Sequence, residues 1–100
     1  MRTKRLRTVL EGMLGPLTFG MFLRAARTGK DMSQTEMAKF LGISKSSLCD
    51  IEKGRQLVTP GLADRIAKKC GLSRTVAVQT CLSDQLRRAG LKFSIEVKAS

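Results

Sequence analysis

A short run near the middle of the chain gathers polar side chains that could hydrogen-bond to nucleic-acid bases. Ser44 can cap a helix there and Gly54 can end it, while Leu48 and Ile51 fall on one face at helical spacing. The polar residues left facing outward are Lys45, Ser46, Ser47, Cys49, Asp50 and Lys53. Amine, hydroxyl and carboxylate groups are the donors and acceptors that meet base edges in DNA. The pattern therefore predicts a helix that could enter a major groove.

Residues suited to catalysis or metal binding are scarce. The chain has no histidine, and we recognise neither a catalytic pair of carboxylates nor a glycine-rich phosphate loop. Cys49, Cys70 and Cys81 are too few and too scattered for a disulfide framework or a zinc site. We therefore expect no enzymatic activity, no catalytic residue and no bound metal, and a reducing, cytoplasmic environment.

The charge of the chain favours a polyanionic partner. Lysine and arginine number 19 against 8 acidic residues, a net charge of +11. Residues 31–60 are balanced between two basic flanks, which suits a centre that makes selective contacts while the ends hold phosphates. A generally basic, solvated surface explains the charge equally well. No apolar run is long enough for a membrane span or signal peptide, although the basic start also resembles a transit peptide.

The polar helix belongs to a pair of helices joined by a tight turn. Ser33 and Glu36 match a capping box, which starts a helix over 34–41. Gly42 ends that helix because glycine adopts the left-handed conformation without strain. The polar helix follows over 45–53. This arrangement matches a helix-turn-helix unit position by position.

The apolar residues of this unit indicate how it packs. Ala38 is small at the point where the two helices would cross most closely. The face expected to press on the rest of the domain comprises Met37, Leu41, Ile43, Leu48 and Ile51.

Three more helices are marked by caps and stops. They run from Thr18 to about Arg27 before Gly29, from Thr59 and Pro60 to Cys70 before Gly71, and from Ser73 to Ala89 before Gly90. The buried stripe expected in the last helix comprises Val78, Leu82, Leu86 and Ala89.

The end of the chain changes its period. Polar residues alternate with the apolar residues Leu91, Phe93, Ile95 and Val97. This two-residue repeat predicts a half-buried strand. Since a lone strand leaves its edges unpaired, we expect these four residues to form a dimer interface with a second copy of the chain.

The stretch LRAARTGKDMSQTEMAKFLGISKSSLCDIEKG, followed by TPGLADRIAKKCGLS, resembles the phage-repressor and Cro-like (XRE) helix-turn-helix family over residues 17–72. The resemblance implies an all-α, five-helix lambda-repressor-like domain that binds double-stranded DNA as a dimer and needs no cofactor. We add to it a basic arm or short helix over 1–15, and a C-terminal helix with a short β-strand for dimerisation over 73–100.

The resemblance also implies roles for individual residues. Base contacts would come from Lys45, Ser46, Ser47 and Asp50. Phosphate contacts would come from Gln34, Ser44, Lys53 and Arg55. Arg27 and Glu52 would form a partly buried ion pair.

Several of these roles have alternatives. The serines could be simple caps and surface residues, and Asp50 could pair with Lys45 or Lys53 on its own helix. The chain departs from relatives at Leu57 and Val58, apolar residues in the loop after the polar helix, which puts phosphate contacts from that loop in doubt.

The function expected from these observations is a transcriptional regulator, in the first instance a repressor that reads a palindromic operator as a dimer. The alternative is an antitoxin that regulates its own operon and inhibits a toxin protein, to whose sheet the C-terminal strand could add. A third possibility is a fold kept for protein contacts alone.

Overall fold

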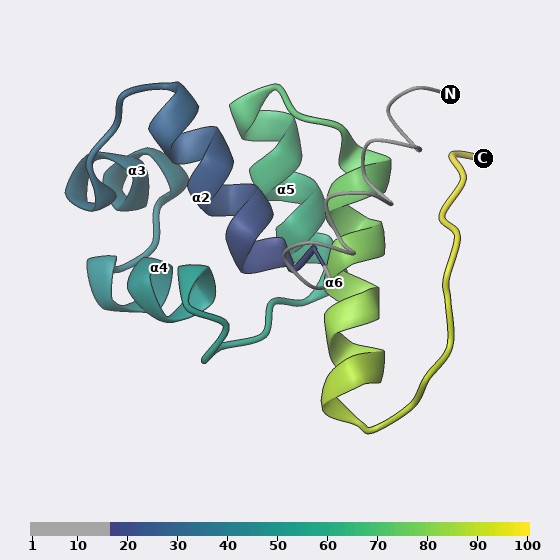
Figure 1. Ribbon diagram of the computed structural model, residues 1–100. Coiled ribbons are helices and arrows are strands. Elements are labelled where there is room, and N and C mark those ends of the chain that lie inside the picture. The colour runs from purple at the N-terminus through teal and green to yellow at the C-terminus, as the bar shows by residue number, and fades with distance from the viewer. Residues whose placement is uncertain (1–16) are drawn as a thin grey trace.

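The computed structural model describes residues 17–100 as five α-helices (Figure 1). They are α2 (Phe19–Gly29), α3 (Gln34–Leu41), α4 (Lys45–Glu52), α5 (Pro60–Cys70) and α6 (Arg74–Arg88). No residue between 17 and 100 lies in a β-strand. The arm or short helix predicted over 1–15 lies outside the described residues.

All five predicted helix starts are confirmed. At each start a side-chain oxygen accepts the backbone N–H of the residue three positions later, which satisfies one of the amides left unpaired at a helix terminus. The capping residues are Thr18, Ser33, Ser44, Thr59 and Ser73. The end of α2 differs slightly from prediction. The helix continues through Gly29, and Asp31 takes the left-handed conformation after it (φ 54°).

The helices pack around one apolar core. In Figure 1, α2 and α5 lie between the α3–α4 pair and α6. Every helix contributes buried apolar residues, and Val58 adds one from the loop between α4 and α5. The core comprises Phe19, Leu23, Met37, Ala38, Leu48, Ile51, Val58, Ala63, Ile66, Ala67, Cys70, Ala77 and Cys81. No helix of the described residues is long and apolar enough to cross a membrane.

The predicted buried face of α6 is wrong. The residues of α6 that are buried are Ala77, Thr80 and Cys81. The predicted stripe is half-buried along Val78, Leu82 and Leu86, and Ala89 is exposed. The inner face tolerates polar groups because they find partners: the Thr80 hydroxyl, for example, donates to the Ala77 carbonyl at 2.9 Å.

The structure does not support the predicted C-terminal strand. Residues 91–100 form an extended segment that runs back beside α6 (Figure 1). Val97 N–H donates to Gln79 Oε1 at 3.3 Å, whereas Leu91 and Phe93 are 46% and 69% exposed. A strand requires a ladder of backbone partners, and residues 17–100 supply no such ladder to this segment.

Candidate nucleic-acid interface

The turn between α3 and α4 is built by local hydrogen bonds. Gly42 lies in the left-handed region (φ 72°), and the N–H groups of Gly42 and Ile43 donate to the carbonyls of Lys39 and Ala38 at 3.2 and 3.0 Å. Ala38 is buried, as expected for the crossing point of the two helices. These bonds set the angle at which α4 leaves the turn.

The start of α3 is held by the predicted capping box. The backbone N–H of Ser33 donates to Glu36 Oε1 at 2.8 Å, and the N–H of Glu36 donates to Ser33 Oγ at 3.1 Å. The hydrogen bonds from the Ser33 backbone and hydroxyl lower the pKa of Glu36. The carboxylate is therefore favoured, which also suits the positive end of the helix dipole.

The end of α4 is held by direct contact with the backbone of α2. A methyl group on Gly20 would come within 2.7 Å of the Glu52 carbonyl oxygen and closer still to that of Ile51. Only a residue without a side chain permits this approach. Together with the buried side chains of Leu48 and Ile51, the contact leaves α4 little freedom to shift against the domain.

A polar network joins α2, α3 and α4. Arg27 Nε and Nη2 donate to Glu52 at 2.7 and 3.1 Å, and Arg27 Nη1 donates to the Met32 carbonyl at 3.0 Å. The two side chains are 13% and 3% exposed, and the hydrogen bond to Glu52 raises the pKa of Arg27. The predicted ion pair is thus confirmed.

Gln34, a predicted phosphate-binding residue, belongs to the same network. Its Nε2 donates to Glu52 Oε1 at 3.2 Å. An amide nitrogen carries two hydrogens, so this bond orients the group and leaves one N–H for another acceptor. Gln34 is half-buried at the start of α3, next to the solvent.

The outward face of α4 carries the predicted base-reading residues. Lys45 and Ser46 are exposed, whereas Ser47 and Asp50 are half-buried. The Ser47 hydroxyl donates to Gln56 Oε1 at 3.1 Å, so its proton is already used within the protein. Ser44 acts as the helix cap, because its hydroxyl accepts the Ser47 N–H.

Asp50 finds a partner that the sequence did not indicate. Its carboxylate lies 3.7 Å from Arg55 Nη1, with side chains 40% and 67% exposed. The loop turns back because the N–H groups of Arg55 and Gln56 donate to the Asp50 carbonyl at 2.8 and 3.2 Å. The alternative pairing of Asp50 with Lys45 or Lys53 is not formed among the described residues. The turn instead brings the predicted phosphate-binding Arg55 over the end of α4.

Comparison with known proteins agrees with this geometry. A model of a helix-turn-helix domain matches residues 18–78, well over half of the chain. The chain belongs to the phage-repressor and Cro-like (XRE) helix-turn-helix family. It is similar to the "ImmF control region 10 kDa protein" of Bacillus phage phi105, with 40% identity over 68 residues, 68% of this chain and 76% of the relative. No solved structure matches it significantly. The protein is a DNA-binding regulator of transcription.

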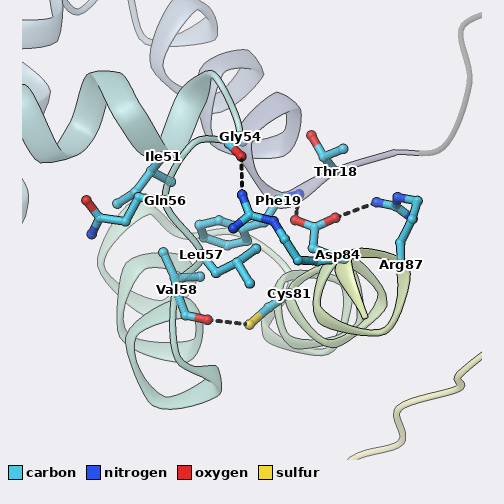
Figure 2. Close-up of a pocket in the computed structure, with 12 residues that line it drawn as sticks. Thr18, Phe19, Ile51, Gly54, Gln56, Leu57, Val58, Cys81, Asp84 and Arg87 are labelled. Carbon is cyan, nitrogen blue, oxygen red and sulfur yellow. Dashed lines mark hydrogen bonds and ion pairs between the residues drawn. The ribbon is translucent and has the colours of Figure 1, made fainter. Parts of the chain in front are cut away.

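In this helix-turn-helix protein α6 also holds the loop that follows α4, a role that the sequence did not reveal (Figure 2). Cys81 Sγ and Gln85 Nε2 both donate to the Val58 carbonyl, at 3.1 and 3.2 Å. Arg88 Nη2 donates to the Gly54 carbonyl at 3.1 Å. The Val58 side chain is 5% exposed and belongs to the core, which accounts for an apolar residue here, while its carbonyl anchors the loop.

The same face of α6 caps α2. Asp84 Oδ2 accepts the Phe19 N–H at 2.9 Å, and its Oδ1 accepts from Arg87 at 2.6 Å (Figure 2). Burial raises the pKa of Asp84, while the Phe19 N–H and Arg87 act in the opposite direction. A cavity of about 240 Å³ lies between this face, the start of α2 and the loop. The spacing of the polar residues at 81, 84, 85 and 88 was the available signal, since it marks one helical face.

Proposed function

We propose that this protein is a transcriptional repressor that binds a palindromic operator as a homodimer, with α4 of each copy in a major groove. The observation that carries the proposal is the polar outer face of α4, held rigidly by α2 and α3. Binding to DNA is the whole of the proposed activity, and no catalytic step is part of it.

The residues of α4 divide the work of recognition. Lys45, Ser46, Ser47 and Asp50 would meet base edges: the lysine donates to guanine, and the aspartate accepts from cytosine. Ser46 can donate or accept, whereas Ser47, whose proton goes to Gln56, can accept. The phosphates would be held by Gln34, Ser44, Lys53 and Arg55. Gln34 is supported in this role by its bond to Glu52, which directs its amide before DNA arrives.

Dimerisation is supported by apolar surface in the C-terminal part of the chain. Leu91 and Phe93 are exposed, and the half-buried Val78, Leu82 and Leu86 lie on α6. A second copy of the chain that covers these side chains would remove their apolar surface from water. A two-fold dimer would place two copies of α4 about 34 Å apart, one turn of B-DNA.

Repression is the simplest regulatory outcome for such a protein. A domain that occupies an operator can block transcription without further contacts. The name of the phage relative, a control-region protein, is consistent with a regulatory role.

Selection of binding sites from random duplexes tests the proposal. The enrichment is repeated at low and at physiological salt, because non-specific phosphate binding collapses as salt rises. We expect a palindrome to survive. An enriched site without two-fold symmetry would contradict the dimer, and loss of all enrichment at physiological salt would contradict specific recognition.

Variants of α4 then test which of its residues read bases of the selected DNA site. Lys45→Gln should relax preference at one base position, with a loss of about 1 to 3 kcal/mol for the cognate site. The matched control is Lys68→Gln, an exposed lysine on α5. If both variants lose affinity equally on all sequences, Lys45 does not read a base.

Sedimentation equilibrium tests the dimer. Phe93→Ser should weaken self-association, whereas Phe40→Ser removes an exposed phenylalanine from α3 and should not. A monomeric wild-type protein would contradict the proposal. The antitoxin alternative depends partly on a C-terminal strand, which residues 91–100 do not form. Co-purification of a toxin-like protein would be needed to support it.

A further inference from the structure

Arg88, in the last turn of α6, lies against the part of the chain that ends the reading helix. Its Nη2 is 3.1 Å from the carbonyl of Gly54. Gly54 lies between Lys53 and Arg55, which are both exposed. The bond therefore places the guanidinium of α6 at the backbone between two residues that we assign to DNA phosphates.

The chemistry of this guanidinium leaves it able to bind an anion. An arginine has five N–H donors, and Arg88 uses one of them on Gly54. Among residues 17–100, no carboxylate oxygen lies within 4.0 Å of an Arg88 nitrogen. The residue is exposed, so its remaining donors can be reached.

Neighbouring arginines differ in this respect. Arg87 is 2.6 Å from Asp84, and Arg55 is 3.7 Å from Asp50, so a carboxylate offsets part of each charge. Arg88 bonds instead to a neutral carbonyl, and no carboxylate among residues 17–100 offsets its charge. Its planar fork suits a phosphate, which accepts two parallel N–H bonds.

We propose that Arg88 binds a DNA backbone phosphate next to those bound by Lys53 and Arg55, so that the DNA interface extends from the helix-turn-helix unit onto α6. This inference rests on the proposed function. The phosphate that Arg88 binds belongs to the same duplex that α4 reads, because the Gly54 contact joins Arg88 to the end of α4. The contact adds affinity and carries no sequence preference.

The competing explanation is that Arg88 only straps the loop to α6. Arg88→Gln separates the two roles, because glutamine retains an amide N–H for the Gly54 carbonyl but has no charge. Arg88→Lys retains the charge without the fork, and should restore the salt dependence and part of the binding. The matched control is Arg65→Gln, which removes the same charge from an exposed position on α5.

The experiment measures affinity for the selected operator and for a random duplex at about 50 and about 200 mM salt. Each phosphate contact changes affinity by about threefold over this range. We expect Arg88→Gln to weaken binding to both duplexes alike, and its deficit relative to wild type to be about threefold larger at the lower salt. Arg65→Gln should behave as wild type.

Two results would overturn the proposal while leaving the proposed function intact. One is an Arg88→Gln protein with wild-type affinity and salt dependence, which would make Arg88 a strap alone. The other is an equal deficit in Arg65→Gln, which would mean that net charge is responsible. Failure of the wild-type protein to bind any duplex would instead overturn the proposed function, and this contact with it.

Discussion

Two regions of the molecule, the α3–α4 unit and the C-terminal region (α6 with residues 91–100), each begin at a capping serine. They differ in which side chains they bury. In the unit, the expected residues Met37, Leu48 and Ile51 face the core. In α6, the apolar stripe is left half-exposed, and the inward face carries Thr80, Cys81, Asp84 and Gln85. In α6, the face whose polar groups find hydrogen-bond partners is turned inward in place of the more apolar stripe.

Ion pairs show the same contrast. Arg27–Glu52 closes the helix-turn-helix unit with side chains 13% and 3% exposed, whereas Arg74–Asp64 joins α6 to α5 with side chains 55% and 32% exposed. Both pairs use two guanidinium nitrogens. The same chemistry should therefore matter far more in the first region.

Arg27→Met gives the largest expected effect. Removing one partner of a buried pair strands the other charge, and we expect a loss of about 3 kcal/mol in the free energy of unfolding. This lies near the low end of the range because Gln34 still donates to Glu52. Urea denaturation measures the loss. Arg74→Met is the matched control and should change stability little, and equal losses would break the comparison.

Gly20→Ala should cost somewhat less, about 2 kcal/mol, because its methyl group would force α2 away from the carbonyls at the end of α4. Gly29→Ala in the same helix meets nothing within 4 Å and should be neutral or slightly stabilising. Thermal unfolding of the two variants compares them. An unaffected Gly20→Ala protein would show that α4 is not pressed on α2.

Phe93→Ser probes the C-terminal segment. Phe93 is 69% exposed, so its replacement should change the unfolding free energy by less than about 0.5 kcal/mol when the protein is dilute enough to be monomeric. Chemical denaturation at low concentration provides the measurement. A loss above about 1 kcal/mol would mean that residues 91–100 pack firmly within one chain.

The smallest expected effects concern pH and have opposite signs in the two regions. The lowered pKa of Glu36 means that its contribution to stability is present above its ordinary value of 4.5 and is lost as the pH falls through the lowered value. The raised pKa of Asp84 makes the folded state take up the proton more readily. The charge of the Asp84 carboxylate therefore opposes folding at neutral pH. This destabilisation is relieved as the pH falls from the raised pKa toward the ordinary value of 3.8.

Two neutral variants test these signs in urea unfolding from about pH 7 to about pH 3. Relative to wild type, Glu36→Gln should lose less stability on acidification, and Asp84→Asn should lose more. Parallel pH profiles for the two variants would contradict the opposite environments assigned to the two carboxyl groups.

The amino-acid pattern was sufficient for the helix starts, the glycine turn at Gly42, the α3–α4 unit and the family. The helix starts and the turn depend on groups close together in the sequence, as in the bonds of Ser33 with Glu36. Such signals are visible in a sequence because helix termini leave the same amides and carbonyls unpaired wherever they occur.

Other features depended on the folded chain. The inward face of α6, the anchoring of Val58 by Cys81, the approach of Arg88 to Gly54 and the pairing of Asp50 with Arg55 were not predicted. Cys81 and Val58 lie 23 positions apart, and Arg88 and Gly54 lie 34 apart. Polar side chains have many possible partners in an unfolded chain, and packing of the apolar core selects which of them come within hydrogen-bonding distance.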